Sequence, residues 1–244
     1  MRFEKDIHTA LWGHEEWLVS AHPSAPGRIV GEGGGTLRDV RPDFPLLVKK
    51  ISAKMRLSVQ VHPNDETAKT VGGEAKTEMW CVLSPGIIFA GFKPGTSAAD
   101  IERAVRDGSF EDLLVRFDAR PGECYFIPGG LVHAIGEGTT VYEVQQSSNT
   151  TFRLYDWGRV GADGKPRQLH VREGFAAMNL SLPPPVPGER VDCPYFSFEK
   201  VPAGNLPAAD AWRVVYTPDT DDSQLLRPCE SVELSAPSFV TTVG

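Results

Sequence analysis

The stretch LSVQVHPNDE, residues 57–66, has the composition of a short β-strand that a Pro-Asn-Asp turn brings to an end. Side chains two positions apart on a strand point to the same face, so Gln60 and His62 lie on one face and two valines lie on the other. From this stretch alone, two interpretations of the polar face are open. The face contacts solvent on a half-buried strand, or it holds metal ligands inside a barrel.

Short segments of this kind recur along the chain. The sequence has 24 glycines and 20 prolines, which separate short runs rich in Val, Ile, Leu, Phe and Tyr. The strands that this pattern predicts cover residues 46–51, 57–61, 79–83, 86–92, 123–127, 140–146 and 151–157. Because these segments are short and evenly spaced, we expect an all-β fold built as a sandwich or a barrel.

One segment, residues 97–118, departs from the strand pattern. Ser97 is a candidate N-cap with Asp100 three residues later, and Ile101 and Val105 follow at helical spacing. We therefore expect a helical insertion within the β fold.

A proline-rich segment, SLPPPVPGER at residues 181–190, marks the best candidate for a domain boundary. It predicts a first domain of residues 1–180 and a short second domain of residues 191–244. The second domain contains the strand-like runs YFSFEKV and WRVVYT.

Composition restricts the classes of function. The 244 residues carry a formal net charge of -7, which argues against nucleic acid or an anionic membrane as a partner, since both bind basic surfaces. No apolar run approaches the roughly 18 residues that span a membrane, and the first residues lack the pattern of a secretory signal. We expect a soluble cytoplasmic protein whose four separated cysteines are buried reduced thiols.

Two further stretches extend the polar face of the first. In PGECYFIPGGLVHAIGEG, residues 121–138, His133 follows a tight turn after a predicted strand, with the spacing of the second cupin motif. In GGEAKTEMW, residues 72–80, Glu78 begins a strongly apolar strand, where burial of a carboxylate without a cation is costly. With Gln60 and His62, these residues form a set of nitrogen and oxygen donors suited to Zn²⁺ or a similar ion, with an open position.

Four motifs together are similar to the type I mannose-6-phosphate isomerases, particularly their short bacterial form. They are LSVQVHPND, GGEAKTEMW, IPGGLVHAIGEG and VYEVQQSSNTTFRLYDWGR, and the resemblance runs from about residue 44 to about residue 175. It implies a cupin-type jelly-roll barrel with one zinc ion per chain, held by Gln60, His62, Glu78 and His133. It also implies a metal-dependent isomerase that interconverts mannose 6-phosphate and fructose 6-phosphate through a cis-enediol.

Three more residues match the family's active site by position. Arg153 matches the active-site arginine, and Lys76 and Glu143 match residues that line the same pocket. We prefer Glu143 as the proton-transfer base. The alternatives are a surface pair of Glu143 with Arg153 and a solvated loop lysine at Lys76.

The phosphate of such a substrate requires local cations in an acidic protein. Arg153 and Arg159 are the candidates, because guanidinium groups bind phosphate oxygens in pairs. Ser58 adds a hydroxyl, since it precedes Gln60 by two positions and shares its strand face. The sequence does not decide whether Lys49 points into the barrel or away from it.

The chain departs from the family after Trp212, where it is too short for a complete second cupin-like barrel. We expect an abbreviated second β domain with an open sheet edge that needs a cover, and a homodimer is one way to provide it.

Two other functions stay open. One is a non-catalytic metal-cupin relative that senses sugar phosphates or is structural, and the other is a metal-cupin enzyme such as a dioxygenase. A protein that had lost catalysis would be free to lose Lys76, Glu143 or Arg153, and all three are present. A dioxygenase would more typically use two or three histidines around iron. The isomerase is therefore favoured.

Overall fold

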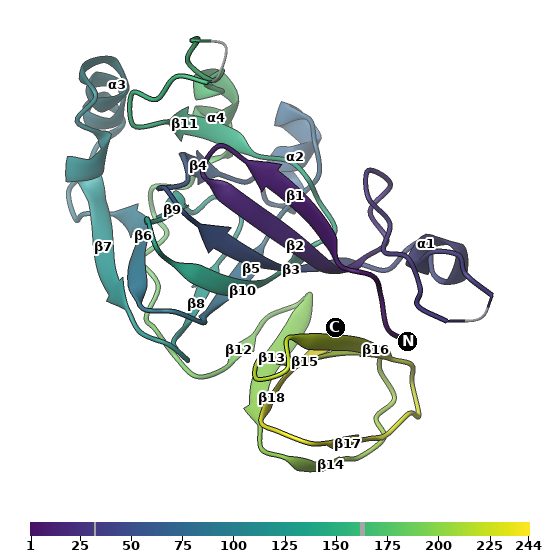
Figure 1. The fold of residues 1–244 in the computed structure, drawn as a ribbon. Coiled ribbons are helices and arrows are strands. Elements are labelled where there is room, and N and C mark those ends of the chain that lie inside the picture. Colours follow the sequence, from purple (N-terminus) through teal and green to yellow (C-terminus); the bar gives the residue numbers. More distant parts are fainter. Residues whose placement is uncertain (32, 162–163) are drawn as a thin grey trace.

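Antiparallel strands dominate the computed structural model, which describes residues 1–31, 33–161 and 164–244 (Figure 1). The first sheet has six strands in the order β1-β2-β3-β10-β5-β8. Its strands are β1 (Asp6–Ala10), β2 (Gly13–Ser20), β3 (Leu46–Ala53), β10 (Thr140–Gln146), β5 (Glu78–Val82) and β8 (Cys124–Ile127).

The second sheet has five strands in the order β11-β4-β9-β6-β7. They are β11 (Phe152–Tyr155), β4 (Val59–Val61), β9 (His133–Ile135), β6 (Gly86–Phe92) and β7 (Leu114–Ala119). One core cluster draws apolar side chains from both sheets, among them Trp80 of β5 and Ile88 of β6. The two sheets therefore pack face to face. The all-β prediction is confirmed, and each strand predicted between residues 46 and 157 overlaps an observed one.

The central strand β5 is buried at every residue. Its side chains alternate between two cores: Trp80 and Val82 point into the cluster between the sheets, whereas Met79 and Cys81 join the cluster shared with the C-terminal part. Because both faces are covered, β5 is apolar from Met79 to Val82, without polar alternation.

Short helices connect the strands. They are α1 (Leu37–Val40), α2 (Asp65–Val71), α3 (Ala98–Asp107), the 3-10 turn η1 (Phe110–Leu113) and α4 (Val171–Ala177). Helix α3 confirms the predicted insertion: the Ser97 side chain accepts a hydrogen bond from the backbone of Asp100, which caps the helix. The helix ends at Gly108, in the left-handed conformation. The end of the segment 97–118 is instead part of strand β7, in which more and less exposed side chains alternate.

The C-terminal part forms a five-stranded sheet in the order β12-β13-β18-β15-β16 and a two-stranded sheet, β14-β17. The strands are β12 (Val191–Asp192), β13 (Phe196–Val201), β14 (Gly204–Leu206), β15 (Arg213–Thr217), β16 (Asp222–Leu226), β17 (Val232–Leu234) and β18 (Ser238–Val243). Tyr216 of β15 stacks on Tyr142 of β10 with ring centroids 5.0 Å apart, so this part packs on the outer face of the first sheet. The division into domains of residues 1–180 and 191–244 stays a prediction.

The edge of the five-stranded sheet is covered by the first residues of the chain. Met1 and Leu225 exchange two backbone hydrogen bonds, with N–O distances of 2.6 and 2.7 Å. The next residue, Arg2, forms an isolated antiparallel β-bridge with Gln224. The edge strand β16 is thus paired within the chain, so its backbone groups have partners without a second subunit.

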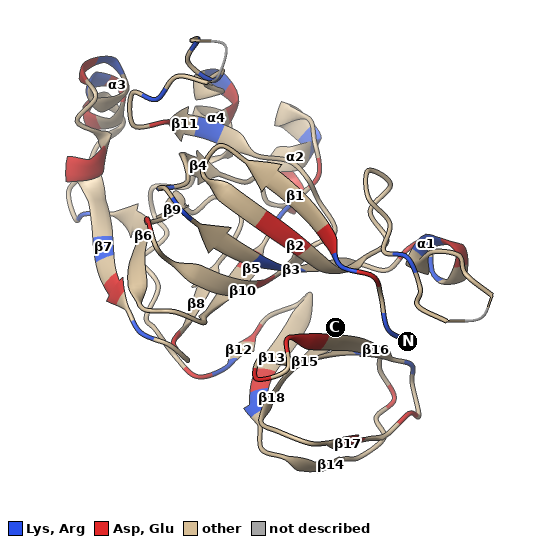
Figure 2. Ribbon diagram, viewed as in Figure 1, with Lys and Arg blue, Asp and Glu red and all other residues tan. Residues whose placement is uncertain are grey.

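Charged residues of both signs are scattered over both parts of the chain (Figure 2). In the ranges that the structure describes, no helix has both the length and the apolar character to span a membrane.

Candidate active site

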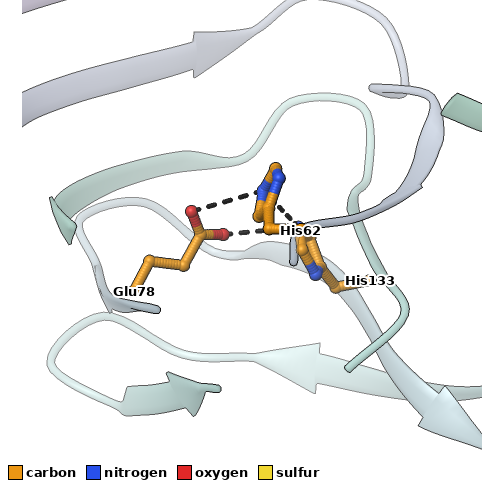
Figure 3. A group of neighbouring side chains, drawn as sticks. All are labelled: His62, Glu78 and His133. Atoms are coloured by element: carbon orange, nitrogen blue, oxygen red, sulfur yellow. Dashed lines mark hydrogen bonds and ion pairs between the residues drawn. The ribbon is translucent and has the colours of Figure 1, made fainter. Parts of the chain in front are cut away.

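Three buried side chains from separate segments of the chain meet inside the first pair of sheets (Figure 3). His62 follows β4, Glu78 begins β5 and His133 begins β9. The Nε2 atoms of His62 and His133 are 3.2 Å apart. Glu78 Oε2 lies 3.5 Å from His62 Nε2, and Glu78 Oε1 lies 3.3 Å from His133 Nε2. The structure therefore brings together three of the four predicted metal ligands as one group.

The fourth predicted ligand, Gln60, borders this group. Gln60 and His133 are cross-strand partners in the β4–β9 pair, and the amide Nε2 of Gln60 lies 3.3 Å from His133 Nε2. The carbonyl oxygen of a carboxamide is its coordinating atom, so Gln60 can add one oxygen donor to the set. All four predicted ligands are neighbours in the fold.

The hydrogen bonds of the two Nδ1 atoms fix the tautomers of both histidines. His62 Nδ1 lies 2.9 Å from the Thr150 carbonyl oxygen, and His133 Nδ1 lies 2.8 Å from the Leu131 carbonyl oxygen. A carbonyl can only accept, so each Nδ1–H donates and each Nε2 keeps a lone pair. Burial lowers the pKa of both rings, that of His133 to about 3. Two neutral rings thus face each other with lone pairs, an arrangement that a cation stabilises.

Glu78 is the other sign that the group fits a metal ion. Its side chain is fully buried, Oε1 has no hydrogen-bond partner among the described residues, and Oε2 has only the Lys76 ammonium, 2.9 Å away. Burial, and then the nearby charge of Glu143, raise the pKa of Glu78 to about 7, although Lys76 opposes the change. A buried carboxylate beside two imidazole lone pairs is a typical donor set for Zn²⁺ and similar divalent ions.

Lys76 precedes β5 and lies between this group and a cavity. Its Nζ is 2.9 Å from Glu78 Oε2 and 3.1 Å from His62 Nε2, and the side chain is buried. Lys76 is therefore a neighbour of the metal-ligand group, as its predicted role requires, and is not a solvated loop lysine.

The cavity beside the group has a volume of about 250 Å³. Its polar lining includes Ser58, Gln60, Lys76, Glu143, Arg153 and Arg167. The structure thus places the predicted substrate-binding serine and the three predicted catalytic residues on one cavity.

Glu143 of β10 is held by residues on both neighbouring strands. Trp80 Nε1 donates to Glu143 Oε2 at 2.8 Å, and Lys49 Nζ lies 3.1 Å from Glu143 Oε1. Trp80 and Lys49 are the register partners of Glu143 on β5 and β3. Lys49 points into the cavity and also contacts Glu15 of β2 at 3.1 Å. The sequence left the direction of Lys49 open, because the strand register decides it.

The two predicted arginines have different surroundings. Arg153 of β11 is the register partner of Gln60 and lines the cavity, and its Nη1 donates to the Gln168 carbonyl at 2.8 Å. Arg159 does not line the cavity and donates instead to Asp156 and to the backbone carbonyl of Arg56.

Arg167 lines the cavity although sequence analysis did not single it out. It lies between β11 and α4, in a polar segment without strand or helix periodicity. No spacing signal marks such a residue, because only the path of the loop brings it to the cavity.

The sequence has relatives among known isomerases. It is 36% identical to mannose-6-phosphate isomerase ManA of Bacillus subtilis over 178 residues, which are 64% of this chain and 55% of that protein. It is 33% identical to the mannose-6-phosphate isomerase of Streptococcus mutans over 201 residues, which are 74% of this chain and 62% of that protein. The chain therefore spans less than two thirds of the length of these relatives. No protein-family model matches it.

Solved structures share the fold. The crystal structure of the mannose 6-phosphate isomerase from Bacillus subtilis matches with a TM-score of 0.76 and 24% identity, over 99% of this chain and 96% of that chain. A mannose 6-phosphate isomerase bound with zinc and yttrium matches with a TM-score of 0.62 and 16% identity, over 100% and 97% of the two chains. The cupin-type fold expected from the motifs is confirmed. Sequence and fold thus point to the same relatives, the mannose-6-phosphate isomerases in their short bacterial form.

Proposed function

We propose that the protein is a metal-dependent aldose-ketose isomerase that interconverts mannose 6-phosphate and fructose 6-phosphate through a cis-enediol. The observation that carries this proposal is the buried group of His62, Glu78 and His133 beside a cavity lined by Glu143, Lys76 and arginine. The names of the relatives supply the substrate class.

One zinc ion per chain is the metal that we propose. The donors would be Gln60, His62, Glu78 and His133, and the zinc-bound relative supports the choice of ion. When bound, zinc supplies Lewis-acid stabilisation of the negative charge that develops on a sugar oxygen.

Glu143 is the proposed proton-transfer base. It takes the proton from C2 of the aldose and returns it to C1 to give the ketose, while the hydroxyl proton on O2 passes to O1, so that the intermediate between the two steps is the cis-enediol. The hydrogen bond from Trp80 and the contact with Lys49 fix the carboxylate on the cavity wall, so it is oriented before the substrate arrives. Lys76 completes the polar wall and is placed to donate a hydrogen bond to a sugar oxygen.

The phosphate end of the substrate requires the cations of the cavity. Arg153 lines it, and Ser58 is placed to donate its hydroxyl to the same ligand. Arg159, proposed from the sequence as a phosphate ligand, contributes there only if its bonds to Asp156 and Arg56 are released.

Isomerase turnover before and after chelation tests the proposal. Purified protein should convert mannose 6-phosphate to fructose 6-phosphate, lose this activity with a chelator and regain it when zinc is restored. Stoichiometric zinc without turnover on this substrate or its epimer would contradict it and favour the non-catalytic relative.

The homodimer stays a prediction. An open edge of the second β domain would favour a dimer, but β16 at that edge is paired with Met1 and Arg2. Light scattering of the purified protein measures the oligomeric state directly.

A further inference from the structure

The ring of His62 is oriented by a backbone carbonyl on a loop far from it in sequence. His62 Nδ1 donates to the Thr150 carbonyl oxygen at 2.9 Å, and Thr150 lies between β10 and β11. The ring keeps Nε2 directed at Glu78 and His133 only while that carbonyl stays in place. The geometry of the metal-ligand group therefore depends on what fixes Thr150.

Thr150 is fixed by the segment that leads into β5. The Glu74 backbone N–H donates to Thr150 Oγ1 at 2.9 Å. The Thr150 backbone N–H donates to Ser148 Oγ at 3.2 Å, and the buried Ser148 hydroxyl donates to the Glu74 carbonyl oxygen at 3.0 Å. These three bonds form a closed ring that joins the two segments of the chain.

The carboxylate of Glu74 holds the same loop from a second side. The Asn149 backbone N–H donates to Glu74 Oε2 at 3.3 Å, and Asn149 lines the cavity. His22, which follows β2, has Nε2 at 3.2 Å from the same oxygen. The Ser24 backbone N–H donates to His22 Nδ1 at 3.2 Å, so Nδ1 is the acceptor of the ring and Nε2–H donates to Glu74.

Gly73 allows the two segments to approach this closely. A Cβ atom at Gly73 would lie 2.7 Å from both Cγ2 and Oγ1 of Thr150, which is far inside van der Waals contact. Its neighbour Gly72 has a similar backbone conformation, with φ +81° against +90° at Gly73, but a Cβ atom there would meet nothing within 4 Å. The two glycines thus separate the contact with Thr150 from backbone strain.

We infer that Thr150 is a positioning residue for the candidate ligand His62, and that Glu74 and Gly73 hold Thr150 in place. The inference rests on the proposed metal site but not on the isomerase reaction. A group that orients a ligating imidazole contributes to metal affinity, because it fixes both the tautomer and the direction of the ring. Glu74 lies just ahead of Glu78 in the chain, so the same bonds link the segments that carry two of the proposed ligands.

The zinc affinity of the full chain, measured by competition with a chromophoric chelator, tests this inference. Thr150→Val keeps the shape of the side chain but removes the acceptor of the Glu74 N–H, whereas Thr150→Ser keeps that acceptor. We expect Thr150→Val to weaken zinc binding by about 10-fold, at the lower end of the usual effect of such groups. Thr150→Ser should stay within about threefold of wild type. Equal zinc affinities of the two variants would overturn the inference.

The two glycines provide a second, independent pair of variants. Gly73→Ala should weaken zinc binding by about 10- to 100-fold, because the new Cβ displaces Thr150. Gly72→Ala carries the same kind of backbone strain without that contact, and should change the affinity by no more than about threefold. Urea unfolding of the zinc-free proteins shows that each variant is folded during the titration. If Gly73→Ala does not fold, the two threonine variants decide the inference.

A His62→Ala background tests whether the effect passes through His62. Thr150→Val should have no further effect on the residual zinc affinity there, because the ring that Thr150 orients is gone. An equal loss with and without His62 would assign the effect to general destabilisation and overturn the inference. If His62→Ala binds zinc too weakly to compare, the threonine and glycine pairs decide.

Turnover is measured on the same proteins, so that the two proposals can fail separately. Wild-type protein that binds zinc without isomerase activity would contradict the proposed function and leave this inference intact. An active enzyme whose zinc affinity is the same in all variants would contradict this inference alone. Wild-type protein that binds no zinc would contradict both.

Discussion

Lys49 and Glu143 face each other across the β3–β10 pair, with Lys49 Nζ 3.1 Å from Glu143 Oε1 and both side chains nearly inaccessible. Lys49 Nζ is also 3.1 Å from Glu15 Oε2. Burial alone would lower the pKa of Lys49, but the two carboxylates outweigh it and raise the pKa. Lys49 is therefore a permanent cation that holds two acidic groups in place on the cavity wall.

Removal of this cation should destabilise the fold. Lys49→Met leaves Glu15 and Glu143 without their shared partner, and we expect a loss of about 3–5 kcal/mol in the free energy of unfolding. Urea unfolding at neutral pH measures it. The control is Lys69→Met, which removes an exposed helix pair with Glu66 and should cost less than about 1 kcal/mol. Equal, small losses in both variants would show that Lys49 is dispensable.

The proton-transfer role of Glu143 predicts a loss of turnover with the metal retained. Glu143→Gln should lower kcat by about 10²- to 10⁴-fold, the usual contribution of a general base, with zinc content unchanged. Kinetics and metal analysis on the same sample provide the measurement. Glu15→Gln removes the other carboxylate that contacts Lys49, and its effect should be clearly smaller. Equal losses in the two variants would assign the effect to Lys49 instead.

Metal removal should reduce stability most at neutral and higher pH. In the chelated protein the pKa of Glu78 is raised by burial from 4.5 to about 7, so the folded state binds a proton more tightly than the unfolded state does. The contribution of Glu78 to the free energy of unfolding of the chelated protein, measured as the difference between wild type and Glu78→Gln, should therefore fall as pH rises from 4.5 to 7, by on the order of 3 kcal/mol. The lowered pKa values of His62 and His133 act in the opposite direction over this range and are common to both proteins.

Zinc should reverse this trend, because the bound ion favours the ionised carboxylate. The gain in unfolding free energy on adding zinc should thus be larger at pH 8 than at pH 5. Thermal and urea unfolding with and without zinc across this range measure it. A gain that does not change with pH, or that persists in Glu78→Gln, would contradict the assignment of Glu78 as a ligand.

A polar contact between the two parts of the chain predicts a different pH dependence. Asp221 Oδ1 lies 2.8 Å from Lys50 Nζ and accepts from Tyr216 Oη at 2.7 Å, and Lys5 donates to Oδ2. Burial alone would raise the pKa of Asp221, but these bonds outweigh it and lower the pKa to about 2. Asp221 therefore stabilises the fold above its ordinary pKa, and this contribution is lost as pH falls toward 2.

The variant Asp221→Asn should lose roughly 1–2 kcal/mol at neutral pH, because the contact is partly exposed. Acid unfolding of the two proteins should converge near pH 2, where wild-type Asp221 begins to take up its proton. Curves that stay parallel down to that pH would exclude this carboxylate as the titrating group.

Sequence analysis succeeded where the signal was local. The alternation of Gln60 and His62, the cap at Ser97 and the apolar run after Glu78 each depend on residues within a few positions, and the structure places each as its pattern requires. The end of the helical segment was missed, because residues 114–118 become a strand through pairing with β6. Arg167 was missed for the related reason that a loop residue acquires its neighbours only through the path of the chain.

By itself, the sequence determined the all-β class, the resemblance to the mannose-6-phosphate isomerases and the four candidate metal donors. These follow from residue spacing and motifs within single segments, because strand geometry fixes which side chains share a face. Only the tertiary structure decided that Lys49 points inward, that Arg167 rather than Arg159 lines the cavity, and that the chain's own first residues cover β16. Those outcomes depend on the register and packing of segments far apart in sequence, which no local pattern specifies.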